Sequence, residues 1–252
     1  MAEPRLLVIY RISDQAQCNN PKHKPPYVTK RGCLENMLRC FPEADVWCIA
    51  DRVSNETFDW LATLDIRRLY RSNFGNGARS FMYGLKLVAD LKEDRPVYMV
   101  EDDYIHRPGG TEAILDGLAL ADYVTLFDAR DKYVNAGEVD GTGCPGNPLI
   151  SAGGEVCRVL LGPRCHYKTT NSTCMTCAGW SSTFRADWDV FQRYNSGAFP
   201  RDFEMWCDLI QNHSRTLVCP IPGFATHGEV QHLAPFTDWE AEAVIDPRAR
   251  SE

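Results

Sequence analysis

Long apolar runs and a surplus of positive charge are both missing from this chain of 252 residues. The first apolar run, Leu6 to Tyr10, lies between Arg5 and Arg11 and is too short for the core of a signal peptide. No stretch approaches the roughly 20 apolar residues that span a bilayer. The net charge of -7 argues against general binding to nucleic acid or to anionic membranes, which needs a basic face. From these absences we expect a cytoplasmic protein.

Cysteine, in contrast, is plentiful, with 11 residues. Their odd number and the missing leader favour reduced thiols over a disulfide framework. A CxxC motif at Cys174 and Cys177, with Cys157, Cys165 and His166 upstream, matches no standard zinc-finger spacing. We therefore expect these cysteines to be buried as small apolar residues, in preference to a structural zinc site. If the motif lies on a strand, alternation would direct Cys174 and Cys177 to different faces.

The apolar pattern is typical of one α/β domain. Short apolar runs such as Val46–Ala50 and Val97–Val100 indicate buried strands, and the i, i+3, i+4, i+7 spacing over residues 28–41 indicates a helix that Pro42 ends. This alternation through residue 127 predicts βαβ units and a mostly parallel sheet. Residues 129–165 are rich in Gly and Pro, and the Thr- and Cys-rich stretch 169–178 is expected to be a strand.

Three adjacent acids, Glu101, Asp102 and Asp103, follow the strand predicted at Val97–Val100. Their mutual repulsion beside a buried strand requires a compensating cation, and a hard divalent metal is the simplest candidate. An acidic turn that caps the strand is the alternative. Ligands of open α/β sheets bind at the carboxyl ends of the strands, where Ser13 and Asp51 also stand.

Three further motifs have both a structural and a functional interpretation. Residues Asn73–Phe81 hold Gly and Asn before a helix, either as an ordinary turn or as an anion site at the helix N-terminus. Asp202 stands at the start of an amphipathic helix. It serves either as the N-cap of this helix or as a general base. His227 lies in a loop bounded by Pro and Gly, as a plain loop residue or as a ligand.

The chain resembles a GT-A glycosyltransferase, similar to the family-2-like enzymes. The resemblance rests on four features in chain order: an amino-terminal half of alternating strands and helices, the acid triplet, the Asp at the start of a later helix, and the late His. The resemblance covers roughly Leu6 to His227. Its most specific motifs, Tyr98–Pro108 (YMVEDDYIHRP) and Ala225–Glu229 (ATHGE), are also similar to uncharacterised bacterial and viral glycosyltransferase-like proteins. The resemblance implies a single GT-A (Rossmann-like) α/β domain with a mixed, mostly parallel sheet flanked by helices.

The resemblance also implies a metal-dependent enzyme that moves a sugar from a nucleotide diphosphate sugar to an acceptor hydroxyl, by inverting displacement. Mn²⁺ or Mg²⁺ would be bound by Glu101, Asp103 and His227. Asp202 would be the base, with Glu204 as its substitute. Residues 1–127 would bind the nucleotide sugar, 128–235 an acceptor (a glycan, a lipid-linked molecule or a modified nucleobase), and 236–252 would be a tail. The implied contacts to the nucleotide sugar are Arg11, Ser13, Asp51, Asn73, Gly77, Arg79 and Asp102.

Two alternatives stay open. A nucleotidyltransferase has a similar fold, but its usual Gly-rich loop after the first strand is replaced here by Arg11-Ile12-Ser13-Asp14. A non-catalytic binding or scaffold protein, with a GT-A-like or zinc-stapled fold, would keep its function when Asp103 is replaced by Ala.

Overall fold

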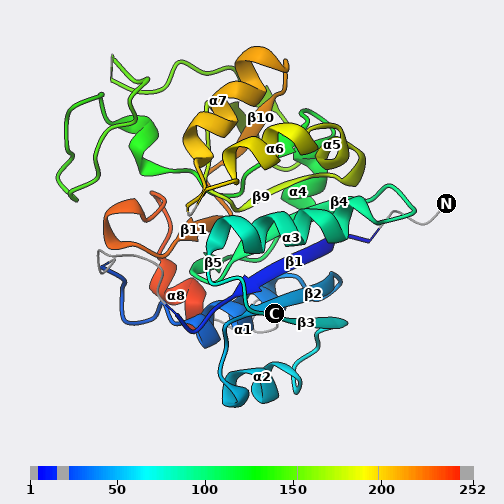
Figure 1. Cartoon of the computed structure of the whole chain (residues 1–252). Coiled ribbons are helices and arrows are strands. Elements are labelled where there is room, and N and C mark those ends of the chain that lie inside the picture. The colour runs from blue at the N-terminus through cyan, green and yellow to red at the C-terminus, as the bar shows by residue number, and fades with distance from the viewer. Residues whose placement is uncertain (1–4, 16–22, 152, 198, 245–252) are drawn as a thin grey trace.

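The computed structural model describes residues 5–15, 23–151, 153–197 and 199–244. Its centre is a nine-stranded sheet with the order β3-β2-β1-β4-β9-β6-β10-β8-β7. A separate pair of strands, β5 and β11, lies beside it. Helices cover both faces of the large sheet, as Figure 1 shows. No helix in these described stretches is both long enough and apolar enough to cross a membrane.

The amino-terminal half forms the expected parallel βαβ units. Strand β1 pairs in parallel with β2 and with β4, and β2 pairs in parallel with β3. The strands are β1 (Leu7–Ile12), β2 (Asp45–Asp51), β3 (Arg68–Ser72) and β4 (Pro96–Glu101), and the connecting helices are α1 (Lys30–Cys40), α2 (Asn55–Leu61) and α3 (Gly77–Ala89).

Beyond β4 the sheet becomes mixed. Strand β9 runs antiparallel between β4 and β6, and β8 is antiparallel to both β10 and β7, while β10 is parallel to β6. These strands are β6 (Tyr123–Val124), β7 (Val159–Leu161), β8 (His166–Thr169), β9 (Cys177–Trp180) and β10 (Leu217–Ile221). The mixed α/β sheet flanked by helices that the sequence predicted is therefore confirmed.

The remaining elements close the site end of the sheet and cover its faces. Strand β5 (Tyr104–His106) pairs antiparallel with β11 (Ala225–His227). The helices are α4 (Gly110–Leu118), α5 (Ser181–Ala186), α6 (Trp188–Tyr194), α7 (Asp202–Asn212) and α8 (Trp239–Val244), with short 3₁₀ turns η1 (Arg130–Tyr133) and η2 (Val230–His232).

Alternation along the central strands divides the core into two layers. Val8 and Tyr10 pack on the side of α1, α4 and α8, whereas Leu7 and Ile9 pack on the side of α3, α5, α6 and α7. Figure 1 shows α1 and α8 on one side of β1 and α3, α5, α6 and α7 on the other. Successive strand residues point to opposite faces, so a strand covered on both sides is apolar throughout. This explains why these strands appear in the sequence as continuous apolar runs.

The prediction of a strand over residues 169–178 is wrong. Its first residue ends β8, its last two begin β9, and the chain between them is irregular. The threonine hydroxyls there make their own hydrogen bonds: Thr173 to Thr125 at 2.9 Å and Thr176 to the backbone N–H of Glu101 at 3.2 Å. Hydroxyls that bond locally compete with a strand ladder. The two cysteines do pack on opposite faces, Cys174 against the α1 layer and Cys177 in the α3 layer.

Candidate active site at the carboxyl edge of the sheet

The acid triplet lies where the parallel strands end. Strand β4 ends at Glu101, Asp102 and Asp103 form a turn, and β5 begins at the next residue. His227, at the end of β11, is paired with Tyr104, and the Gly228 N–H donates to the Asp103 carbonyl at 2.7 Å. Backbone pairing between two strands that lie far apart in the sequence thus holds His227 beside the triplet.

Asp103 contacts two cationic or potentially cationic groups. Its Oδ2 lies 2.9 Å from Lys24 Nζ and 3.2 Å from His227 Nε2. The same imidazole nitrogen is 3.5 Å from Glu229 Oε1. Burial raises the pKa of the Asp103 carboxyl, but His227 and Lys24 outweigh it and hold this pKa well below its usual range. Asp103 is therefore an ionised carboxylate next to an imidazole.

Asp102 points toward β1 and α1. Its Oδ2 accepts the Ser13 N–H at 2.9 Å and lies 3.6 Å from Lys30 Nζ. Burial, assisted by the charge of Asp103, raises the pKa of Asp102 in spite of Lys30. Two neighbouring carboxyl groups in one site have pKa values that are driven apart, and here Asp103 has the lower pKa of the two.

Glu101 has different neighbours. Its carboxylate is 3.4 Å from the Arg11 guanidinium and 3.4 Å from the Thr176 hydroxyl. Arg11, opposite Glu101 in the β1–β4 register, also donates to the Gly77 carbonyl at 3.2 Å. Each acid of the triplet thus has its own basic partner, and Arg11 links the triplet to the start of α3.

Asp202 is the first residue of α7, and Arg201 takes the N-cap position, so the N-cap expected at Asp202 is off by one. The Asp202 carboxylate accepts the N–H of Phe203 at 2.9 Å. Burial, with the charge of Glu101 second, raises the pKa of Asp202 to about 6. Glu204 is exposed and forms no ion pair with another residue in the part of the chain that the structure describes.

Asp51 organises the turn that follows β3. Its carboxylate accepts from the Ser72 hydroxyl at 3.0 Å and from the N–H groups of Phe74 and Gly75 at 2.6 and 2.9 Å. Gly75 has a φ of 66°, a value that favours glycine. Asn73 belongs to the same turn, where its side-chain oxygen accepts from Arg52 at 2.9 Å.

The turn continues into α3, where Asn76 is the N-cap and accepts the N–H of Arg79. The Arg79 side chain is exposed. The structure therefore brings Arg11, Ser13 and Gly77 up to the acid triplet, whereas Asp51 and Asn73 shape the turn beside it.

Four residues at this edge were not assigned to the site from the sequence: Lys24, Lys30, Thr176 and Glu229. Lys24 lies in a Pro-rich loop, which carries no local pattern that points to the site. Lys30 is the first residue of α1. Glu229 ends the ATHGE motif, which is the one local signal that could have identified it. Residues 16–22 of the Pro-rich loop lie outside the described residues.

The residues present fit a divalent cation in part. Within the described ranges, no group of three or more His, Cys, Asp or Glu side chains is arranged to hold a metal ion. Asp103 and His227 are in contact, but Glu101 faces Arg11 and Thr176. An oxygen and a nitrogen ligand suit Mn²⁺, and Mg²⁺ commonly keeps waters and substrate phosphates as its other ligands. A metal here would need substrate oxygens or water to complete its coordination.

A buried ion pair within the second half of the chain stabilises the segment that begins next to this site. Asp128 is fully buried, and its Oδ1 lies 2.9 Å from Lys168 Nζ. The Tyr133 hydroxyl is 2.8 Å from both oxygens of Asp128. Phe127 packs edge-on against the rings of Tyr104 and His227. The Gly- and Pro-rich segment is thereby fixed against the wall that carries His227.

No protein-family model and no curated protein matches this chain. The structure is similar to that of GalNAc-T7 in a crystal with UDP, GalNAc and Mn²⁺, with a TM-score of 0.55 and 11% sequence identity over 89% of this chain and 43% of that chain. This chain has a GT-A-like fold. It spans less than half the length of that neighbour.

Two other solved structures give lower scores. 4-Diphosphocytidyl-2C-methyl-D-erythritol synthase from Anaerococcus prevotii DSM 20548 has a TM-score of 0.48 and 13% identity over 93% of this chain and 92% of its own. A putative nucleotide-diphospho-sugar transferase from Desulfovibrio desulfuricans G20 has a TM-score of 0.46 and 11% identity over 85% and 78%.

Proposed function

We propose that this protein is a glycosyltransferase that moves a sugar from a nucleotide diphosphate sugar to an acceptor hydroxyl. The observation that carries the proposal is the meeting of Asp102, Asp103 and His227 at the carboxyl edge of a GT-A-like sheet. Open α/β sheets bind ligands at this edge. The neighbour crystallised with UDP and Mn²⁺ supports a nucleotide donor. Strand β1 ends in Arg11-Ile12 and is followed by Ser13-Asp14 instead of a glycine-rich triphosphate loop.

Asp202 is proposed as the general base of an inverting displacement. The acceptor O–H would give its proton to the Asp202 carboxylate while the oxygen forms a bond to the anomeric carbon. The bond from that carbon to the β-phosphate oxygen would break, and the nucleotide diphosphate would leave with the electron pair. A pKa of about 6 leaves Asp202 mostly ionised at neutral pH and basic enough to accept the proton. Glu204, exposed two residues on, is the weaker candidate.

Cationic groups at the triplet would balance the charge of the leaving group. Mn²⁺ or Mg²⁺, when bound by Asp103 and His227, would stabilise the diphosphate electrostatically. Arg11 holds Glu101, and Lys30 holds Asp102, so these carboxylates are kept in place before substrate binds. Lys24, 2.9 Å from Asp103, would lie beside the donor phosphates. Positioned charges that need no rearrangement are the largest source of catalysis in many enzymes.

The first test is thermal unfolding of the protein with nucleoside diphosphates and their sugars, with and without Mn²⁺. A ligand that binds only the folded state stabilises it by about 2.7 kcal/mol at a hundredfold excess over its Kd. We expect one nucleotide to raise the Tm, and Asp103→Ala to lose the response that depends on metal. Asp189→Asn, an exposed carboxylate on α6, is the matched control and should respond like the wild type.

The second test separates the two transfer chemistries. Release of nucleoside diphosphate from a nucleotide sugar in the presence of acceptor indicates glycosyl transfer, whereas pyrophosphate release from a nucleoside triphosphate indicates nucleotidyl transfer. Asp202→Asn should reduce the first reaction by about 100-fold or more while nucleotide binding is kept, because it removes the base. If no nucleotide changes the Tm of the wild type, the donor-site proposal is wrong.

A further inference from the structure

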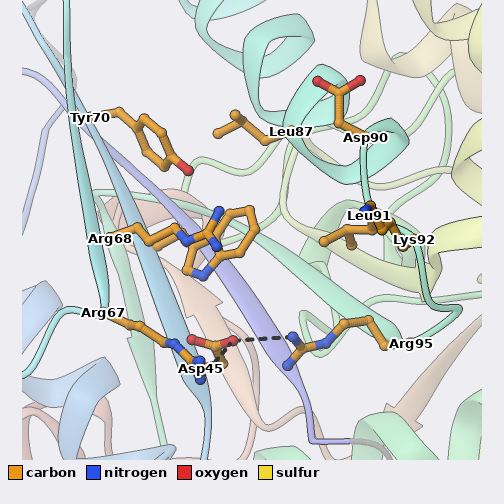
Figure 2. A pocket seen from close by; sticks show the side chains of 10 residues that line it. Asp45, Arg67, Arg68, Tyr70, Leu87, Asp90, Leu91, Lys92 and Arg95 are labelled. Atoms are coloured by element: carbon orange, nitrogen blue, oxygen red, sulfur yellow. Dashed lines mark hydrogen bonds and ion pairs between the residues drawn. The ribbon is translucent and has the colours of Figure 1, made fainter.

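A pocket of about 480 Å³ lies at the edge of the sheet opposite the acid triplet. It is formed where β2 and β3 begin and where α3 ends and leads to β4, as Figure 2 shows. Sites for small molecules usually enclose about 300 to 1,000 Å³. The proposed transferase reaction takes place at the other ends of these strands and uses none of the residues that line this pocket.

The pocket is lined by four cationic side chains and only two carboxylates. Figure 2 shows Arg67 and Arg68 on the strand side and Lys92 and Arg95 on the side of α3 and its following loop. Asp45 is shared by two of them, at 3.1 Å from Arg95 and 3.6 Å from Arg67. The other carboxylate, Asp90, is paired with Lys86 at 2.9 Å. Positive charge therefore remains on both walls.

Two of these cations have no anionic partner of their own. Within the described residues, the side chains of Arg68 and Lys92 form neither a hydrogen bond nor an ion pair. Arg68 lies over the indole of Trp47 at 4.2 Å, which holds its guanidinium in one place without neutralising it. A guanidinium that is already oriented loses less freedom when it binds a phosphate or a carboxylate.

Two buried polar atoms of the pocket lining also lack a partner in the described part of the chain. The indole N–H of Trp47, a residue that is 5% exposed, has no acceptor, and Oδ1 of Asp45, 4% exposed, has no donor. Both atoms are shielded from solvent by the side chains around them, and the Trp47 indole lies directly under the Arg68 guanidinium.

We propose that this pocket binds a small organic phosphate at a second site, separate from the carboxyl edge. The phosphate would lie between the cations of the two walls. The organic part would lie against Tyr70 and Leu87, which face each other in Figure 2. Arginine binds phosphate through paired N–H groups, and aromatic and aliphatic walls suit a planar ring. A nucleoside monophosphate has this chemistry.

The test follows the Trp47 indole N–H by NMR of ¹⁵N-labelled full-length protein, with its resonance assigned from Trp47→Phe. Inorganic phosphate and AMP are the probes. We expect the Trp47 resonance to shift in a saturable way with AMP and less strongly with phosphate. The indole N–H of Trp239, which donates to the Ala234 carbonyl at 2.8 Å away from this pocket, is the internal control and should not move.

Matched variants locate the binding site. Arg68→Gln combined with Lys92→Gln changes two exposed side chains and should weaken AMP binding by about tenfold or more, since charge-assisted hydrogen bonds to phosphate are lost. Arg31→Gln is the control, because Arg31 also lies over an indole, that of Trp60 at 4.9 Å. A Trp47 resonance that does not respond at millimolar probe, or binding that survives the double variant and disappears in Asp103→Asn, would overturn the proposal.

Discussion

Single carboxylates at the carboxyl edge of the sheet have different tasks, and Asp51 is the clearest structural case. It accepts three hydrogen bonds from the turn at residues 72–75. Asp51→Ala should lower the free energy of unfolding by about 3 kcal/mol, because bonds to a buried charged acceptor are lost together. Urea denaturation measures this. Asp59→Ala, at an exposed position of α2, should change it by less than about 0.5 kcal/mol. Equal effects would contradict the assignment.

His106 gives the protein a pH-dependent stability. It is fully buried, and burial lowers its pKa from 6.5 to about 3. Between these values the unfolded chain binds a proton that the folded protein does not. The free energy of unfolding therefore falls as the pH falls below 6.5, by up to about 1.4 kcal/mol per pH unit, and this contribution is constant above 6.5.

Replacing His106 separates its contribution to the pH dependence of stability from that of the other titrating groups. His106→Gln keeps a polar partner for the Tyr98 hydroxyl, now 3.0 Å from His106 Nε2, but does not titrate. Between about pH 7.5 and about pH 5, the wild type should lose about 2 kcal/mol more than this variant in urea denaturation. His213→Gln, at an exposed histidine, controls for the replacement of a histidine as such. Parallel slopes for all three proteins would show that His106 is not the source.

At the scale of elements, α4 depends on a glycine that faces the sheet. A Cβ at Gly117 would lie 2.7 Å from Val124 Cγ2 and 3.1 Å from the Tyr167 ring. Alanine normally stabilises a helix interior by about 0.5 to 1 kcal/mol over glycine. Here the steric clash should outweigh this gain, so Gly117→Ala should destabilise the protein by about 1 to 3 kcal/mol.

A double-mutant cycle in urea tests the cause. If the clash with Val124 is responsible, Gly117→Ala should cost less in a Val124→Ala background, with a coupling of about 1 kcal/mol. Additive effects would place the strain elsewhere. Glu112→Ala, at an exposed position of the same helix, controls for a general effect on α4 and should be close to neutral.

Elements with strong local patterns were predictable. The apolar spacing over 28–41 predicted α1, which the structure gives as Lys30–Cys40, with Thr29 as its N-cap. The stretch 169–178 was not predictable in this way, because its threonines bond to Thr125 and Glu101, which lie far away in the sequence. The intrinsic propensity of these residues is compatible with a strand, but their hydrogen bonds to distant residues keep the segment irregular.

The candidate site shows the same limit. The sequence predicted that the acid triplet stands at a strand end and needs a cation. It could not predict that Lys24, 79 residues away, contacts Asp103, since that contact depends on how a Pro-rich loop folds back. The roles of Glu101, Asp103 and His227 as metal ligands, and of Arg11, Ser13, Asp51, Asn73, Gly77, Arg79 and Asp102 toward a nucleotide sugar, stay predictions.

At the scale of the whole molecule, the two halves of the chain share one sheet. Strand β9, from the second half, pairs with β4 on one side and β6 on the other. We therefore expect one cooperative unfolding transition, with coincident midpoints by circular dichroism and by tryptophan fluorescence. A fragment of residues 1–127 would leave β4 as an unpaired edge and should not fold to a monomer. A stable, monomeric fragment, or two separate transitions, would show that the halves are independent units.

The pairing of β5 with β11 also sets when the site can form during synthesis. Asp103 and His227 are 124 residues apart in the chain, and the pairing of these two short strands holds them together. The ribosome adds about 5 to 20 residues per second, so the acids would wait about 6 to 25 s for their imidazole partner. A nascent chain that already contains the acid triplet therefore remains without a complete site until His227 has been translated.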